Sequence, residues 1–404
     1  MKPSSSRIAK RVLASALAGL AFGALAQEQT IRIGLVAPMS GALAVSGKAN
    51  QKGGQLAVDE LNRRQLRIGG QRARFELMAE DDAGDPKQGT AAAQKLVDAK
   101  VNGVVGHQTS GSAIPASRLY SEAGIPQVSP SVTAPKYTDQ GFKTTFRIVA
   151  GDASIGDAIA THAVRQLRLK RFAIVDDRSS YGHGIAEEFA KAAVRAGGTI
   201  VGREHASDKS SDFSAILTAI KAQQPDAIFV GGMYAMAGPM LRQMKQLGLG
   251  ASVLGGDGIC DNELLRLAGG AARDDQVFCA ASGEIEDDRE GRLRDFRKAY
   301  RQRFDMDPEL VSLYSYDAVK VLADAMRRAD SASPETYLPL LARTRDYAGL
   351  TGRISFDAKG DLLHPQLALY TFQARRARAP GDDPDALSGR AQRTLNTAWS
   401  ACRL

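Results

Sequence analysis

Short aliphatic and β-branched runs alternate along the chain with longer segments whose apolar residues recur at helical spacing. The first such strands are expected at 30–36, 74–78 and 101–106, and the helices between them at 48–61 and 86–100. Asp85 is a suitable N-cap for the second helix, and Pro86 suits its first position. This alternation is typical of parallel βαβ units, so the sequence predicts an α/β fold.

The same alternation restarts after residue 170 and predicts a second set of units. Its strands are expected at 171–175, 199–201, 227–232 and 252–255, and its helix at 185–196. Two consecutive doubly wound sets with no long linker between them indicate two similar lobes. Ligands of open α/β sheets bind at the carboxyl ends of the strands. The loops in which to look for function are therefore 38–46, 107–112, 129–133, 176–184, 231–238 and 256–261.

The first 26 residues have the pattern of a secretory signal. Four basic residues precede an apolar run over 12–25, and the small residues up to Ala26 fit a cleavage site. A membrane anchor is the alternative, but a spanning helix needs roughly 20 apolar residues and this run is shorter. We therefore expect cleavage near Ala26 and a periplasmic mature protein. A lipid anchor is not expected, because no Cys follows the cleavage site.

Composition fits a globular protein and does not indicate a nucleic-acid partner. Hydrophobic residues make up 44% and charged residues 24% of the chain, which are ordinary proportions. The net charge is +8, but without the four basic residues of the signal 49 Lys and Arg remain against 45 Asp and Glu, a charge of only +4. Part of this excess lies in the arginine-rich segment 375–404, which we interpret as a flexible, solvated tail rather than a binding patch.

The sequence lacks the motifs that would indicate catalysis, a cofactor or a metal. Its five histidines show no metal-ligand spacing, and it contains neither a Gly-x-Ser-x-Gly elbow nor a Walker phosphate loop. His107 lies beside the expected pocket, where we favour a structural or pocket-lining role. These observations predict a binding protein rather than an enzyme.

The three cysteines allow one disulfide in an exported chain. Cys260 and Cys279 are close enough in sequence to pair, which leaves Cys402 over. Two buried free thiols are the alternative. A bridge that closes a loop of this size would stabilise the fold by roughly 3 kcal/mol.

Hydroxyl groups gather in two of the expected pocket loops. Ser110, Gly111 and Ser112 stand at a strand-to-helix turn, where hydroxyls and free backbone N–H groups suit a carboxylate. Residues 129–133 add a second hydroxyl pair after the next strand, and helix capping is the alternative for either loop. Asp257, between two glycines, is the acidic residue best placed to meet an ammonium group, with a turn-forming role as the alternative.

Several short motifs follow one another in a fixed order between about residues 31 and 372. They are DDAGDPKQ at 81–88, VGH at 105–107, PAS at 115–117, SP at 129–130, TAP at 133–135, YG at 181–182, GG at 231–232 with LRQ at 241–243, and FDAKGD at 356–361. As an ordered set they resemble the leucine/isoleucine/valine-binding proteins of bacterial ABC transport.

What the resemblance implies is a type I periplasmic-binding fold, with two lobes that are joined by three crossovers and close on the ligand by a hinge. We expect one lobe over 27–148 and 283–350 and the other over 149–282 and 351–374. The implied function is that of an extracytoplasmic solute-binding protein, a monomer that captures an amino acid or similar small carboxylate for an inner-membrane ABC permease. Branched-chain amino acids are among the expected ligands. A same-fold sensor or carrier for amides, urea or aromatic acids is the alternative.

The resemblance also implies roles for single residues. Ser110 and Thr133 would hold the α-carboxylate of the ligand. The backbone at Ser131 and the side chain of Asp257 would receive its ammonium group. Tyr181 would close over the ligand from the second lobe.

The chain departs from the family pattern at the side-chain end of the expected pocket. Ser46 stands where branched-chain amino-acid binders have an aromatic residue, and Met233 precedes Tyr234 where a Tyr often follows the Gly-Gly pair directly. Asp257 is one methylene shorter than the Glu that is frequent in the family. We count Ser46, Met233, Tyr234 and Gly111 as further candidate ligand contacts, but the sequence does not predict which side chain the ligand carries.

Overall fold

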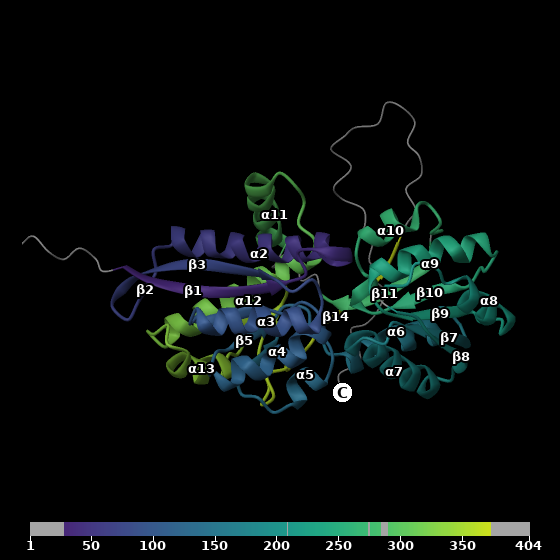
Figure 1. The fold of residues 1–404 in the computed structure, drawn as a ribbon, viewed down its shortest axis with the longest axis horizontal. Coiled ribbons are helices and arrows are strands. Elements are labelled where there is room, and N and C mark those ends of the chain that lie inside the picture. Colours follow the sequence, from purple (N-terminus) through teal and green to yellow (C-terminus); the bar gives the residue numbers. More distant parts are fainter. Residues whose placement is uncertain (1–27, 208, 274, 284–289, 373–404) are drawn as a thin grey trace, which may run out of the picture.

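Two α/β lobes lie side by side in the computed structural model, which describes residues 28–372 except 208, 274 and 284–289 (Figure 1). The predicted signal over 1–26 and the predicted tail over 375–404 lie outside the described residues. Within those residues, no helix combines the length and the apolar character needed to span a membrane.

The first lobe is built on a six-stranded sheet with the strand order β2-β3-β1-β4-β5-β6. Its strands are β1 (Glu28–Ala37), β2 (Arg67–Ile68), β3 (Gln71–Asp81), β4 (Gly103–Gly106), β5 (Gln127–Ser129) and β6 (Thr145–Arg147). All neighbouring strands are parallel except β2 and β3. From Ile33 onward every side chain of β1 is buried, as its continuous apolar run predicts for a parallel strand covered on both faces.

Helices cover both faces of this sheet. The helices of the lobe are α2 (Ala44–Arg63), α3 (Pro86–Asp98), α4 (Ser110–Glu122), α5 (Lys136–Asp139), α11 (Glu290–Phe304), α12 (Leu310–Arg328) and α13 (Pro334–Ala342). On one face α2 and α12 share a core with β1 and β3, and on the other face α3 and α4 pack on β1 and β4. The predicted cap of α3 is present, because the Asp85 side chain accepts hydrogen bonds from the backbone N–H groups of Lys87 and Gln88.

The second lobe repeats the architecture with the strand order β14-β11-β10-β9-β7-β8. Its strands are β7 (Arg171–Asp176), β8 (Thr199–His205), β9 (Ala227–Gly231), β10 (Ser252–Gly255), β11 (Val277–Ser282) and β14 (Leu367–Thr371), and only β14 runs antiparallel to its neighbour. Its helices are α6 (Asp152–Arg165), α7 (Ser180–Arg195), α8 (Ser214–Ala222), α9 (Tyr234–Gln246) and α10 (Glu263–Ala268). Residues of α6 and α7 pack on one face of the sheet, and residues of α8, α9 and α10 pack on the other.

Helix α7 begins earlier than the predicted start at residue 185. The Ser179 side chain accepts a hydrogen bond from the backbone N–H of Gly182 at 2.9 Å and so caps the helix. Gly182 and Gly184 lower the helix propensity of this first turn, which is why the local pattern did not reveal it.

The segments that cross between the lobes lie against one another. The Ala150 N–H donates to Ser282 Oγ at 2.6 Å, and the Gly283 N–H donates to the Gln366 carbonyl at 3.1 Å. The Tyr314 hydroxyl, on α12, donates to the Ser282 carbonyl at 2.5 Å. The lobes are therefore joined at one level of the molecule, which suits a hinge.

Residues 354–361 pack on the first lobe, although the sequence analysis assigned 351–374 to the second. The Phe356 ring is buried against Phe146, with centroids 5.0 Å apart, and the Arg147 Nε donates to the Asp361 carboxylate at 2.5 Å. These contacts hold the segment beside β6, and the chain joins the second sheet only with β14. The predicted boundary at 351 is therefore too early.

Candidate functional site

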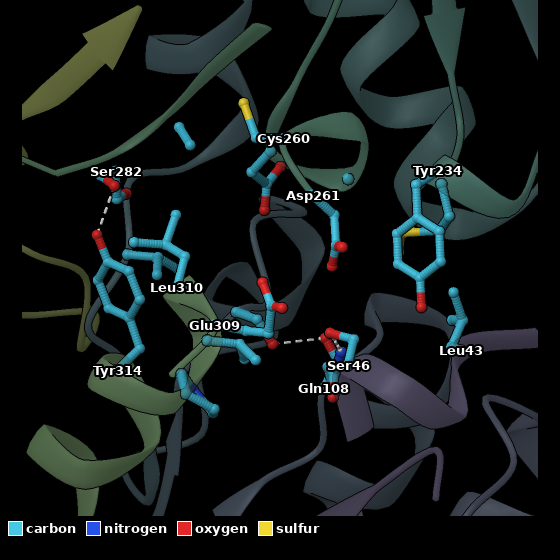
Figure 2. Close-up of a pocket in the computed structure, with 18 of the residues that line it drawn as sticks. Leu43, Ser46, Gln108, Tyr234, Cys260, Asp261, Ser282, Glu309, Leu310 and Tyr314 are labelled. Carbon is cyan, nitrogen blue, oxygen red and sulfur yellow. Dashed lines mark hydrogen bonds between the residues drawn. The ribbon is translucent and has the colours of Figure 1, made fainter. Parts of the chain in front are cut away.

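A pocket between the lobes is lined by residues from the carboxyl ends of strands in both sheets. Most of the predicted site residues line it: Ser46, Ser110, Ser131, Tyr181, Met233, Tyr234 and Asp257. Gly111 and Thr133 are not among its lining residues, although Thr133 is fully buried. The lining also includes residues that the sequence analysis did not single out, namely Leu43, Gln108, Pro130, Val149, Asp261, Ala281, Ser282, Glu309, Leu310, Val311 and Tyr314 (Figure 2).

Two hydroxyl groups of the first lobe are suited to an anion. Ser110 begins α4, and its Oγ is buried without a hydrogen-bond partner among the described residues. The Thr133 Oγ1, after β5, also forms no hydrogen bond of standard geometry, although its hydroxyl lies close enough to the Asp152 carboxylate to lower the pKa of that group. Ala113 of α4 packs against Val132, which holds the two segments together. Buried hydroxyls are normally paired, so these two groups and the N-terminus of α4 provide donors for a carboxylate.

Asp257 is held in place by a tyrosine from another part of the second lobe. The Tyr181 hydroxyl donates to Asp257 Oδ1 at 2.9 Å and accepts from the Gly258 N–H at 2.8 Å. The flanking glycines permit this approach, because a Cβ at Gly258 would lie 2.7 Å from the Tyr181 ring and one at Gly256 would lie 2.9 Å from its hydroxyl. Burial raises the pKa of Asp257 to about 6. A cation placed beside this carboxylate would replace the solvation that it has lost.

Asp152 is a second acidic group near Asp257 that sequence reasoning did not identify, and it is buried outside the residues that line the pocket. It is the first residue of α6, just after the first crossover, and its backbone N–H donates to the Thr133 carbonyl at 2.9 Å. Neither carboxylate oxygen forms a hydrogen bond of standard geometry among the described residues, but the nearby Thr133 hydroxyl acts to lower the pKa of this carboxyl. Burial raises the pKa of Asp152 to about 7, and among the neighbouring charges Asp257 raises it most. In the sequence, an Asp at this position indicates only the start of a helix.

Gln108 organises the first-lobe wall of the pocket, and the sequence analysis did not single it out. Its Nε2 donates to Ser46 Oγ at 2.8 Å, and its Oε1 accepts from Asn50 Nδ2 at 3.3 Å. The Ser131 hydroxyl donates to the Gln108 carbonyl at 2.7 Å. This network joins the N-terminal part of α2 to the loops after β4 and β5 and accounts for the hydroxyls of Ser46 and Ser131.

His107 lies behind this wall rather than in it. Its Nδ1 is 2.9 Å from Asp82 Oδ2 and its Nε2 is 3.2 Å from the Tyr120 hydroxyl, and its side chain is fully buried. The ring therefore connects the loop after β3 to α4, which is a structural role.

Cys260 and Cys279 form a disulfide. Cys260 follows the short 3-10 helix at Asp257–Ile259 and lines the pocket, whereas Cys279 lies in β11. The bridge fastens the loop that carries Asp257 to the neighbouring strand of the sheet.

Known proteins are similar to this chain over nearly all of its described residues. The family model described as Periplasmic binding protein matches residues 30–379. The Leu/Ile/Val-binding protein BraC3 of Rhizobium johnstonii is 34% identical over 367 residues, which make up 90% of this chain and 97% of the relative. The leucine-, isoleucine-, valine-, threonine-, and alanine-binding protein of Pseudomonas aeruginosa is 32% identical over 94% of this chain and 99% of its own length.

Solved structures show the same similarity. The branched-chain amino acid transporter substrate-binding protein LivJ of Streptococcus pneumoniae, in complex with isoleucine, is 30% identical, with a TM-score of 0.76 over 86% of this chain and 97% of that chain. The leucine-binding protein LivK of Thermotoga maritima is 27% identical, with a TM-score of 0.78 over 85% of this chain and 95% of that chain. These similarities include both lobes.

Proposed function

Because the chain belongs to the periplasmic binding protein family, we propose that it is the extracytoplasmic solute-binding component of an ABC transporter and that its ligand is an α-amino acid. The observation that supports this most is the opposition of unlike groups at one pocket. The first lobe offers the unpaired Ser110 hydroxyl in the pocket lining, with the Thr133 hydroxyl buried outside that lining, and the second lobe offers the carboxylate of Asp257. Such groups match the two charged ends of a zwitterion.

Aliphatic side chains provide much of the remaining pocket wall. They belong to Leu43, Val149, Met233, Leu310 and Val311. A wall of this kind favours a ligand with an aliphatic side chain or stem. The names of the relatives, which refer to leucine, isoleucine and valine, support the same expectation.

Transport would follow from closure of the lobes on the ligand. Since the two charged ends of the ligand contact different lobes, binding favours the arrangement in which the lobes approach each other. The adjacent crossovers at Ala150, Ser282 and Gln366 can bend together. We further propose that a membrane permease recognises this closed form, and that the segment 1–26 is removed near Ala26 on export.

A thermal-unfolding screen of the purified mature protein tests the proposed ligand class. We expect L-leucine at 100 times its Kd to raise the free energy of unfolding by about 2.7 kcal/mol. L-leucine methyl ester lacks the free carboxylate, and 4-methylpentanoate lacks the ammonium group, so neither should stabilise the protein comparably. Stabilisation by benzoate or by simple amides, with none by any amino acid, would contradict the proposal.

The affinity for an amino acid should depend on pH through Asp257. Its pKa is raised to about 6 in the ligand-free protein, and an ammonium group at the carboxylate lowers that pKa in the complex. Binding therefore favours the ionised form, so affinity should be highest above pH 6 and fall by up to about tenfold per pH unit as the pH drops below it. Calorimetry of L-leucine between pH 5 and 8 measures this dependence.

Asp152 is the matched control for the pH dependence, because its own pKa is raised to about 7. The Asp152→Asn variant should retain the loss of affinity near pH 6 and lose only any dependence between pH 6 and 8. A flat profile from pH 5 to 8 in the unmodified protein would count against Asp257 as the ammonium contact.

A further inference from the structure

Two carboxyl groups in the pocket have no role in holding a zwitterion. Asp261 follows the 3-10 helix on the second lobe, and Glu309 immediately precedes α12 on the first lobe. Both line the pocket, and Figure 2 shows both directed toward the space between the lobes. Asp261 Oδ1 accepts a hydrogen bond from the Glu263 N–H at 2.8 Å, which leaves its second oxygen for another donor. Neither carboxylate forms an ion pair with a Lys or Arg of the described part of the chain.

Glu309 interacts electrostatically with Asp261 more strongly than with any other charged group, so these two carboxyl groups form a pair distinct from Asp152 and Asp257. The strongest charge acting on Glu309 is that of Asp261, whereas the strongest charge acting on Asp152 is that of Asp257. The pKa of Glu309 is raised to about 7, chiefly by burial and then by the charges of Asp261 and Glu263, while a hydrogen bond with Asn262 acts to lower it. Carboxyl groups from both lobes therefore lie close enough to oppose each other's ionisation in the ligand-free pocket.

Tyr234 provides an independent sign that this end of the pocket receives a ligand group. Its side chain is 4% exposed and lines the pocket, yet its hydroxyl forms no hydrogen bond of standard geometry among the described residues, and only the Ser46 backbone N–H lies near it as a donor. Figure 2 shows the hydroxyl directed into the pocket between Asp261 and Leu43. Burial raises the pKa of Tyr234, and the strongest charge acting on it is that of Asp261. A buried hydroxyl is normally paired, so its partner is expected from outside the chain.

We propose that Asp261, Glu309 and Tyr234 form a subsite for a positively charged group at the end of the ligand's side chain. The preferred ligand is then a basic α-amino acid with an aliphatic stem. This inference rests on the proposed function, because it takes the head group to be held at Ser110 and Asp257. A side-chain ammonium has three donors and no acceptor, and the subsite offers three oxygen acceptors from both lobes.

The aliphatic wall of the pocket agrees with such a ligand. Leu43 and Leu310 line the same pocket as the three oxygens. The methylene stem of a lysine-like side chain packs on apolar surface while its charged end reaches polar groups. A cation between Asp261 and Glu309 would also offset their mutual repulsion, which acts across the gap that closes on binding.

Calorimetry with L-lysine and L-norleucine tests the subsite, because norleucine has the same four-carbon stem without the terminal ammonium. The full mature protein is expected to bind lysine at least about tenfold more tightly than norleucine. Glu309→Gln and Tyr234→Phe should each reduce that ratio severalfold, because lysine loses a contact of its terminal ammonium and norleucine has no such group to lose. Glu335→Gln, an exposed glutamate at the start of α13, is the matched control and should leave both affinities unchanged.

The outcomes separate the subsite from the proposed function. Equal or tighter binding of norleucine or leucine than of lysine, unaffected by Glu309→Gln, would overturn the subsite and leave the proposed function standing. Failure of lysine, norleucine and leucine alike to bind would overturn the proposed function, and the subsite with it. Tyr234→Phe removes one oxygen and little volume, so it serves as the second variant if Glu309→Gln fails to fold.

Discussion

Asp257→Asn is expected to weaken the binding of L-leucine by about 2–5 kcal/mol, which is about 30-fold to several-thousandfold in Kd. The substitution preserves the shape of the side chain and an oxygen for the Tyr181 hydroxyl, but it removes the negative charge that faces the ligand's ammonium group. The complex would then hold a desolvated cation without its counter-charge. Calorimetry at pH 7.5 measures the change in Kd.

The loss of affinity should not come from unfolding. Because burial in the ligand-free protein disfavours the charged form of Asp257, the asparagine variant should be at least as stable as the unmodified protein at this pH. Asp157→Asn is the control, since Asp157 is an exposed aspartate of the same lobe that pairs with Arg195 at 2.8 Å. An unchanged affinity of Asp257→Asn would remove this residue from the ligand site.

The double substitution Ser110→Ala with Thr133→Val should nearly abolish binding. Each hydroxyl that donates to a charged oxygen contributes roughly 1.5–3 kcal/mol, so the pair accounts for roughly a hundredfold or more in Kd. Ser110 Oγ has no partner within the described part of the protein, whereas the Thr133 hydroxyl lies close enough to the Asp152 carboxylate to lower its pKa. Thermal unfolding without ligand should therefore change little, and any loss of stability should come from Thr133→Val.

Ser117→Ala supplies the contrasting variant on the same helix. The Ser117 hydroxyl is buried and donates to the Ile114 carbonyl at 2.8 Å. This substitution should lower the stability of the ligand-free protein by about 1 kcal/mol and leave affinity intact. If instead the double variant retained its affinity for leucine, Ser110 and Thr133 would not be the carboxylate contacts.

The alternation of strands and helices was predictable because each buried parallel strand is a continuous apolar run. For the same reason the loops after β4, β5, β7 and β10 could be located, and with them Ser110, Ser131, Tyr181 and Asp257. The hydrogen bond between Tyr181 and Asp257 could not be predicted, since it joins residues that are far apart in sequence and depends on how α7 packs beside β10. The two glycines around Asp257 were the only local indication of that approach.

Other site residues have no local signal that distinguishes them. Asp152 resembles an ordinary first-turn aspartate, and only its burial between the lobes makes it unusual. Glu309 belongs to a segment that returns to the first lobe after two crossovers, so its place in the pocket depends on the whole topology. Phe356 was assigned to the wrong lobe for the same reason. The sequence pattern does not show where the chain passes from one lobe to the other.

The bridge between Cys260 and Cys279 makes the order of one pocket loop depend on the redox conditions around the protein. When the two sulfurs are oxidised, the loop from Gly256 to Asp261 has a covalent link to β11 in addition to its hydrogen bonds with the Tyr181 hydroxyl. Once anchored, the loop has already lost most of its conformational entropy, so association with a ligand does not have to order it. In the reducing cytoplasm the same loop would keep its hydrogen bonds with Tyr181 but lose the covalent link. The unexported chain would therefore be a weaker trap for cytoplasmic solutes, and full affinity would develop only after secretion and oxidation.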